Sequence, residues 1–145
     1  MEFEVLAEQA TPKLRKAYIA IRGADGADEA TAEAMAWGWE NRERLLSMDN
    51  PVGYLYRVGV SRTSLRKPLV LPDPVEVNCP EVEPGLIPAL ISLPEKQRIA
   101  VWLIHGCQWS YAEVSEALDV STSTVGTHIT RALESLRREL GVEQR

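Results

Sequence analysis

The stretch Trp109–Leu140, WSYAEVSEALDVSTSTVGTHITRALESLRREL, has the pattern of a helix, a tight turn and a second, longer helix. Ser110 and Glu113 have the spacing of a capping box, in which each side chain accepts a hydrogen bond from the other residue's amide. This spacing predicts a short helix after Ser110. The helix should end in a sharp turn at Asp119, a residue type that tolerates the left-handed conformation. Ser121 can then cap a second, longer helix.

The second helix is predicted to have two different faces. Its apolar residues recur every three or four positions and predict one buried stripe, formed by Val125, Ile129, Leu133, Leu136 and Leu140. The candidate DNA-reading residues precede or alternate with this stripe: Thr122, Ser123, Thr124, Thr127, His128 and Arg131. Short polar side chains followed by one arginine fit the major groove of DNA. On spacing alone, an ordinary helical hairpin with a solvated polar face is the alternative.

The composition of the whole chain limits what it can be. With 145 residues, 45% of them hydrophobic, the chain can form one ordinary domain or two very small ones. It has no apolar run near the roughly 18 residues that span a bilayer, and its N-terminus lacks the features of a signal peptide. We therefore expect a cytoplasmic protein that does not insert into membranes.

No catalytic or metal-binding motif stands out in the sequence. There is no nucleophile and base arrangement, no carboxylate pair and no glycine-rich phosphate loop after a strand, so we do not expect an enzyme. The four candidate metal ligands, Cys79, His105, Cys107 and His128, match no zinc spacing, and the two cysteines suggest no disulfide framework. No cofactor and no metal are expected.

The net charge of −5 is unusual for a protein that binds DNA by itself. Lys and Arg supply most of the non-specific affinity for phosphate, and residues 94–145 hold six basic and seven acidic side chains. Free DNA binding should therefore be weak.

The N-terminal part of the chain predicts three helical stretches. The first spans residues 3–21, and Pro12 can break or restart this helix. A turn follows at 23–26. The second spans 27–46, and its residues Met35, Trp39 and Leu46 share a stripe that we expect in the core. Trp37 points about 160° away from Trp39 at ~100° per residue, so it is either a core residue or part of a partner site.

The third helix is predicted to begin at Asn50-Pro51, with Asn50 as its cap and with Val52, Leu55, Val58 and Leu65 on its buried line. Residues 68–92 then hold six of the nine prolines and four acidic side chains, which excludes a helix or a central strand. We therefore expect an all-α chain with a helical domain over 1–67, a flexible acidic linker over 68–92 and a helix-turn-helix domain over 93–145.

These features together resemble bacterial RNA polymerase sigma factors of the small extracytoplasmic-function class, in the sigma-70 family. The resemblance rests on NPVGYLYRVGVSR, the acidic proline-rich linker, LPEKQR and the helix-turn-helix sequence, and it covers nearly the whole chain. It implies that the N-terminal domain, region 2, binds the polymerase clamp and melts the minus-ten element. It also implies that the C-terminal domain, region 4, reads the minus-thirty-five element, and that an anti-sigma factor is a partner.

The resemblance also assigns residues in the N-terminal half. It places DNA contacts on the third helix, at Asn50, Tyr54, Arg57, Ser61 and Arg62. It places polymerase contacts on the second helix, at Asp28, Glu29 and Glu33, to which the off-stripe ring adds Trp37. The sequence departs from the family at Ala30, Thr31 and Ala32 and has Tyr54 where Trp is common. Ser61 replaces a frequent Asn, and in the helix-turn-helix Ser115 and Asp119 replace the usual alanine and glycine.

The function predicted from the sequence is therefore a sigma factor that directs core RNA polymerase to promoter DNA. Two alternatives remain open at this point. One is a stand-alone helix-turn-helix regulator with an N-terminal dimerisation domain. The other is a degenerate sigma-like module that binds only protein.

Overall fold

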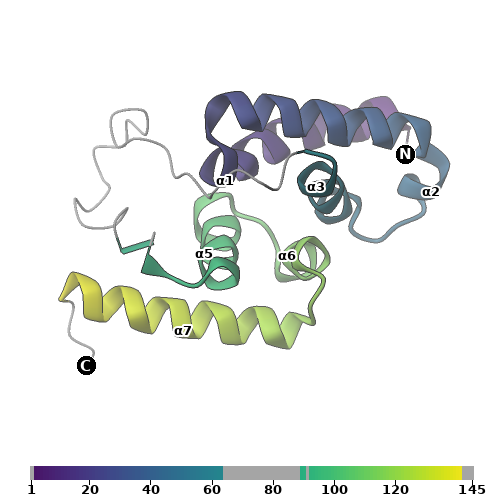
Figure 1. Cartoon of the computed structure of the whole chain (residues 1–145). Helices are drawn as coiled ribbons and strands as arrows, with labels where there is room; N and C mark the ends of the chain where they lie inside the picture. Colours follow the sequence, from purple (N-terminus) through teal and green to yellow (C-terminus); the bar gives the residue numbers. More distant parts are fainter. Residues whose placement is uncertain (1, 64–88, 91, 142–145) are drawn as a thin grey trace.

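The structure is a computed structural model that describes residues 2–63, 89, 90 and 92–141. Its regular elements within these ranges are all helical, which confirms the predicted all-α class (Figure 1). They are α1 (Phe3–Glu40), α2 (Arg42–Leu46), α3 (Pro51–Arg62), α5 (Glu95–Val101), the π-helical turn η1 (Trp102–Gly106), α6 (Tyr111–Leu118) and α7 (Thr122–Leu140). None of these described helices has a segment long and apolar enough to cross a membrane.

The two helices predicted at the N-terminus form one element, α1, which bends at Gly23. This residue has φ 75° and ψ 176°, a conformation that glycine adopts without a Cβ clash. The turn expected over 23–26 is thus reduced to one glycine, while Pro12 lies inside the helix. The stretch predicted as one helix over 27–46 is divided at Asn41 into the end of α1 and the short α2.

Helix α3 packs closely against both segments of α1. The Tyr18 hydroxyl donates hydrogen bonds to the backbone carbonyls of Leu55, at 3.0 Å, and Tyr56, at 2.9 Å. A Cβ atom on Gly59 would lie 2.1 Å from the Tyr18 hydroxyl oxygen and 2.8 Å from the carbonyl oxygen of Ala30. The approach of α3 to α1 therefore requires glycine at position 59.

The prediction that Trp39 lies in the core is wrong, because 49% of this residue is exposed. Its ring packs edge-on against Phe3, with 5.6 Å between centroids, and beneath the Arg42 guanidinium at 4.1 Å. The core-facing side of this part of α1 is instead made of small residues, Ala27, Ala30, Thr31 and Ala34. The predicted stripe of Met35, Trp39 and Leu46 is not the buried face, because small residues instead of large side chains fill the narrow space beneath α3.

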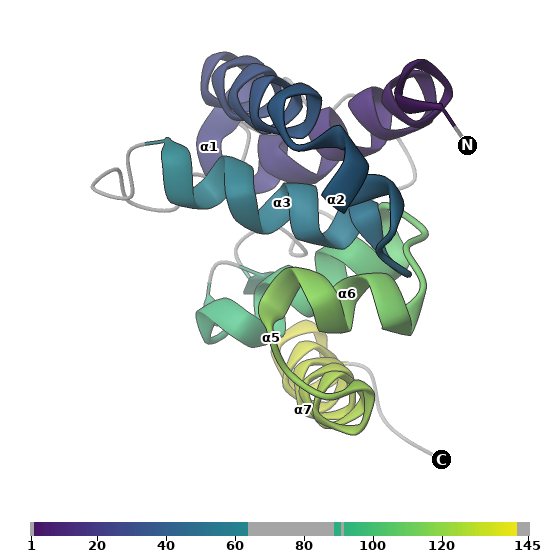
Figure 2. The same cartoon turned by 90° about the vertical axis from the view of Figure 1, so that its right-hand side faces the viewer.

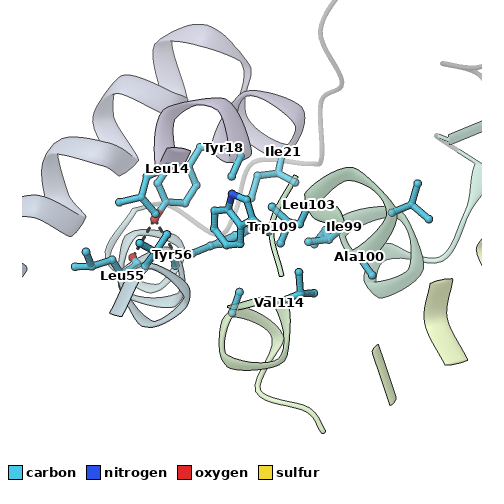
Figure 3. Close-up of a cluster of buried hydrophobic side chains, with 14 of the residues drawn as sticks. Leu14, Tyr18, Ile21, Leu55, Tyr56, Ile99, Ala100, Leu103, Trp109 and Val114 are labelled. Carbon is cyan, nitrogen blue, oxygen red and sulfur yellow. Dashed lines mark hydrogen bonds between the residues drawn. The ribbon is translucent and has the colours of Figure 1, made fainter. Parts of the chain in front are cut away.

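The N-terminal and C-terminal helices share a continuous core in which Trp109 is central (Figure 3). Trp109 is 3% exposed and packs edge-on against Tyr56 of α3, with 5.8 Å between ring centroids. On the neighbouring η1 turn, the Trp102 indole nitrogen donates to the carbonyl of Ala17, at 3.2 Å. We use the name shared core for Trp102 and Trp109 together with the residues of α1 and α3 that they contact.

Helix α6 lies between α3 and α7 in both views of the molecule (Figures 1 and 2). The two helical halves therefore pack directly against each other through α3 and α6. The boundaries predicted for the linker, 68–92, fall mostly outside the described residues and stay a prediction, as does the burial of Leu65.

Candidate nucleic-acid interface

The helix-turn-helix forms with the local geometry that its sequence predicts. The Ser110 hydroxyl accepts from the Glu113 amide at 3.1 Å, and the Glu113 carboxylate accepts from the Ser110 amide at 3.0 Å. Asp119 has the left-handed conformation, with φ 55° and ψ 48°. The Ser121 hydroxyl accepts from the Thr124 amide at 3.1 Å and caps α7. These caps fix the angle at which α7 leaves the turn.

Helix α7 separates its buried stripe from its polar face as expected. Val125, Ile129 and Leu136 are buried, together with Ala132, while Leu133 and Leu140 are half-buried at the edge of the stripe. Of the six candidate DNA-reading residues, four are exposed and two are half-buried; the exposed ones are Thr122, Ser123, Thr127 and Arg131, and the half-buried ones are Thr124 and His128. This face is therefore open to a ligand.

His128 has a partly structural position within this face. Its Nδ1 atom is buried and has no hydrogen-bond partner among the described residues. The ring therefore packs against the helix-turn-helix as well as bordering the exposed face.

A second candidate surface is an open cleft along α3, with a volume of about 410 Å³. Its lining combines two aromatic rings with two arginines: Trp37, Tyr54, Arg57, Val58, Ser61 and Arg62. The Trp37 and Tyr54 rings have centroids 5.3 Å apart, and the Arg57 guanidinium lies 5.0 Å from the Tyr54 centroid. We call this site the α3 cleft. Stacked rings beside guanidinium groups suit unpaired nucleotides, whose bases stack and whose phosphates are negative.

Both arginines of the α3 cleft have acidic partners within the chain. The Arg62 Nε atom lies 3.2 Å from a Glu33 carboxylate oxygen. The Arg57 Nη1 atom lies 3.2 Å from Glu116 and 3.2 Å from Asp119, at the end of α6. The cleft therefore meets the helix-turn-helix half at Arg57.

The structure brings most of the sequence-predicted residues of α3 together, with one exception. Tyr54, Arg57, Ser61 and Arg62 line the α3 cleft, whereas Asn50 does not. Asn50 is the residue before α3, but its side chain makes no capping hydrogen bond, so that expectation is wrong. Pro51 occupies the first helical position, as expected.

The residues expected to contact polymerase do not form one separate site. Asp28 and Glu29 are exposed on α1, and Asp28 pairs with Arg15 at 2.8 Å. Trp37 and Glu33, in contrast, contact the α3 cleft and its arginines. The off-stripe position of Trp37 thus corresponds to a half-buried ring at the cleft.

Sequence reasoning missed two residues at the α3 cleft. Arg44 of α2 lies with its guanidinium 5.6 Å from the Tyr54 centroid and donates to the Tyr54 hydroxyl at 3.4 Å. Val58 was expected on the buried line of α3 but is half-buried and lines the cleft. No sequence pattern pairs Arg44 with Tyr54, because their contact depends on the turn between α2 and α3.

One carboxylate of the helix-turn-helix also contacts α1. The Lys13 ammonium donates to Glu113 at 2.8 Å. Burial raises the pKa of Glu113, but the hydrogen bonds from Lys13 and from the Ser110 amide outweigh burial, so the pKa lies below its usual value. Within the described ranges, no three His, Cys, Asp or Glu side chains gather where they could hold a metal ion.

Comparisons with known proteins agree with this geometry. Residues 86–136 match the family model described as sigma-70, region 4. The structure of the sigma factor RpoE from Bartonella quintana, solved in complex with the anti-sigma factor NepR, has a similar fold, with a TM-score of 0.71. The two chains are 18% identical, and the match covers 98% of each. A search of curated proteins gave no match.

The C-terminal part of the chain thus matches sigma-70 region 4 over residues 86–136, and the chain as a whole has a fold similar to that of the sigma factor RpoE.

Proposed function

We propose that this protein is the promoter-recognition subunit of an RNA polymerase holoenzyme. The observation that carries the proposal is that one chain combines a region 4 helix-turn-helix, whose polar face is open, with an aromatic and arginine-lined cleft on α3. The first surface suits duplex DNA and the second suits unpaired DNA. A protein with both can recognise a promoter and hold its melted strand.

Helix α7 supplies the duplex-reading surface in this proposal. Helix-turn-helix proteins place the N-terminal turns of the second helix in the major groove, while the first helix crosses the backbone. Thr122, Ser123 and Thr127 then face base edges or phosphates, and the longer Arg131 reaches a guanine or a phosphate from two turns further along the helix.

The α3 cleft supplies the surface for unpaired DNA. Trp37 and Tyr54 offer ring faces on which a base can stack, and each such stack is worth about 1 to 3 kcal/mol. Arg57 and Arg62 lie beside the rings, where the phosphates of the strand would pass. Ser61 adds a hydroxyl at the exposed end of the cleft.

The net charge of −5 favours a protein that core polymerase delivers to DNA. The exposed Asp28 and Glu29 on α1 are the proposed contacts with the polymerase clamp, together with Glu33 and Trp37 beside the α3 cleft. An anti-sigma factor is the proposed regulatory partner, by analogy with the complex of RpoE and NepR. The role requires no catalytic step by this chain, and cytoplasmic polymerase places it in the cytoplasm.

Run-off transcription with core polymerase and a library of promoters tests the proposal. We expect specific initiation that depends on the added protein, and no initiation by core polymerase alone. Binding should also be stronger to templates with a preformed bubble at the minus-ten position, because the α3 cleft then needs no melting.

Two other outcomes would support the alternative functions. Specific DNA binding by a stable dimer without polymerase would favour a stand-alone regulator. Absence of initiation from every promoter, together with tight binding of an anti-sigma factor, would favour a protein-binding module.

A further inference from the structure

We propose that Arg44 of α2 is the principal phosphate contact of the unpaired DNA strand, ahead of the two arginines that line the α3 cleft. The proposal rests on the proposed function, because it names a further contact for the strand that the α3 cleft would hold. It follows from the different partners that the three guanidinium groups have within the chain.

Arg44 lies beside a ring on which a base would stack. Its guanidinium is 5.6 Å from the Tyr54 centroid, and the Tyr54 ring packs against Trp37 with 5.3 Å between centroids. A guanidinium can stay over an aromatic ring while its in-plane N–H groups donate to a phosphate. In a single strand, one sugar separates each base from its phosphate. A base stacked on Tyr54 therefore brings a phosphate close to Arg44.

Arg44 differs from the arginines of the α3 cleft in having no carboxylate partner. Arg57 pairs with two carboxylates of the helix-turn-helix, and Arg62 pairs with Glu33. In the part of the chain that the structure describes, Arg44 forms no ion pair, and its guanidinium donates to the neutral Tyr54 hydroxyl at 3.4 Å.

This difference decides what a phosphate must displace at each arginine. Hydrogen bonds between charged groups are about twice as strong as those between neutral groups. A phosphate at Arg57 or Arg62 competes with carboxylates that already hold the guanidinium. At Arg44 it replaces only water and one long hydrogen bond to a neutral oxygen. The charge of Arg44 is therefore the one most available to the strand.

The surroundings of Arg44 also indicate the side on which the strand passes. Arg44 lines an open hollow of about 340 Å³ beside α2, together with Glu40 and Glu43. Neither carboxylate pairs with Arg44 in the described ranges, and both would repel a phosphate that entered this hollow. The strand is therefore expected on the Tyr54 side of Arg44, and not in the hollow beside α2.

Arg42 provides a matched control on the same short helix. It is exposed like Arg44, but its guanidinium lies 4.1 Å from the Trp39 ring and donates to the Trp39 carbonyl at 2.9 Å. It does not line the α3 cleft. Arg42→Ala and Arg44→Ala change the net charge equally, so a difference between them reports the local contact of Arg44.

Titration of a fluorescent single-stranded oligodeoxynucleotide over a series of salt concentrations tests the proposal. Each lost phosphate contact lowers the slope of log K against log salt by about 0.7 for a single strand. We expect Arg44→Ala to lower this slope by about 0.7 and the affinity at low salt by about threefold or more. Arg42→Ala should keep the wild-type slope, and Arg44→Lys, which keeps the charge, should restore it.

Two further comparisons locate the contact. Arg57→Ala and Arg62→Ala should each lower the slope less than Arg44→Ala, because carboxylates already offset their charges. A duplex of the same sequence should show a smaller loss of affinity on Arg44→Ala than the single strand does. With core polymerase and a template that has a preformed bubble, Arg44→Ala should lower initiation at raised salt by about threefold relative to Arg42→Ala.

Several results would overturn the proposal. They are a wild-type slope for Arg44→Ala, a larger loss of slope for Arg57→Ala or Arg62→Ala, an equal loss for duplex DNA, or no binding of the oligodeoxynucleotide by the wild-type protein at low salt. If the wild-type protein with core polymerase initiates from no promoter, the proposed function fails. The oligodeoxynucleotide titrations need no polymerase, so they decide the role of Arg44 separately.

Discussion

The two helices proposed to contact DNA differ in what surrounds them. Helix α7 turns its polar face to solvent, and Arg131 on that face is exposed. Helix α3 is covered by α1 on one side and by α6 on another, and its Arg57 is paired with two carboxylates. The surface proposed to read duplex DNA is therefore open in this structure, whereas the surface proposed for unpaired DNA is restricted at Arg57. The arrangement suits a protein whose strand-holding site is needed only after a promoter has been found.

Disrupting the packing of α7 against α6 should have the largest effect. Val125→Asp places a carboxylate in the fully buried crossing of α6 and α7, where a charge without a partner costs about 3 to 5 kcal/mol. We expect the midpoint of urea unfolding, monitored by circular dichroism, to fall to a much lower urea concentration. Because the two helical halves share a core, the backbone amides of α3 should lose their protection from hydrogen exchange in the same transition.

Ser123→Asp is the matched control for Val125→Asp, since it adds the same charge at an exposed position in the first turn of α7. A carboxylate there is favourable to the helix dipole, so stability should be unchanged or slightly higher. Similar losses for both variants would contradict the burial of Val125.

Substitutions of a glycine in α3 and of a glycine in α7 should have opposite effects on stability. Gly59→Ala in α3 forces a Cβ atom against the Tyr18 hydroxyl and the Ala30 carbonyl, and overpacking of this kind costs about 1 to 3 kcal/mol. Gly126→Ala in α7 meets only Tyr111, at 3.8 Å, and should stabilise the protein by about 0.5 to 1 kcal/mol. Urea unfolding of the two variants checks the opposite signs, and equal signs would show that α3 is not closely packed.

The arginines of the two helices should differ in how they affect DNA binding. Arg131→Ala should weaken promoter binding by about 1 to 3 kcal/mol and relax preference at one base pair if the side chain reads guanine. If Arg131 holds phosphate, the loss should be uniform over sequences. Arg57→Ala should have a smaller effect on the free protein, because this arginine must first leave Glu116 and Asp119. Binding titrations with a promoter library, with folding checked by circular dichroism, measure both, and a folded Arg131→Ala protein with unchanged binding removes Arg131 from the site.

Alkaline pH should destabilise the folded protein through groups buried around α3, and not through groups on the exposed face of α7. Burial raises the pKa of the Cys107 thiol from 9.0 to about 12, although Lys16 and Lys13 oppose the shift. Burial also raises the pKa values of Tyr18 and Tyr56. For each group the neutral form is favoured in the folded state, so its stabilisation is complete below the unfolded pKa and declines above it.

The free energy of unfolding should therefore fall between pH 9 and pH 12, the window set by Cys107. Urea unfolding at a series of pH values measures the fall, and Cys107→Ala should make it shallower by removing one of the three groups. A constant free energy of unfolding across this window would contradict the burial of these groups.

The sequence predicted the helix-turn-helix accurately because its determinants are local. Ser110, Glu113, Asp119 and Ser121 act on amides within a few residues of themselves, so their spacing specifies the geometry. The exposed face of α7 followed from the position of its buried stripe.

The α3 cleft and the shared core could not be predicted in this way. Trp109 and Tyr56 are 53 residues apart, and Lys13 and Glu113 are 100 apart, so no periodicity relates them. The error at Trp39 has the same origin, because which face of α1 is buried depends on how closely α3 can approach it. Gly53 packs closely against α6, and Gly59 packs closely against α1. Both glycines are visible in the sequence, but a sequence does not say which helix a glycine faces.

The burial of Tyr56 by Trp109 has a consequence for how the protein is made. A ribosome adds about 5 to 20 residues per second, so Trp109 is synthesised roughly 3 to 10 s after Tyr56. Both residues take the same path out of the ribosome, so α3 emerges roughly 3 to 10 s before the part of the chain that covers Arg57. In each newly made molecule, the α3 cleft proposed to hold unpaired DNA is therefore uncovered at Arg57 until the second half packs against α3.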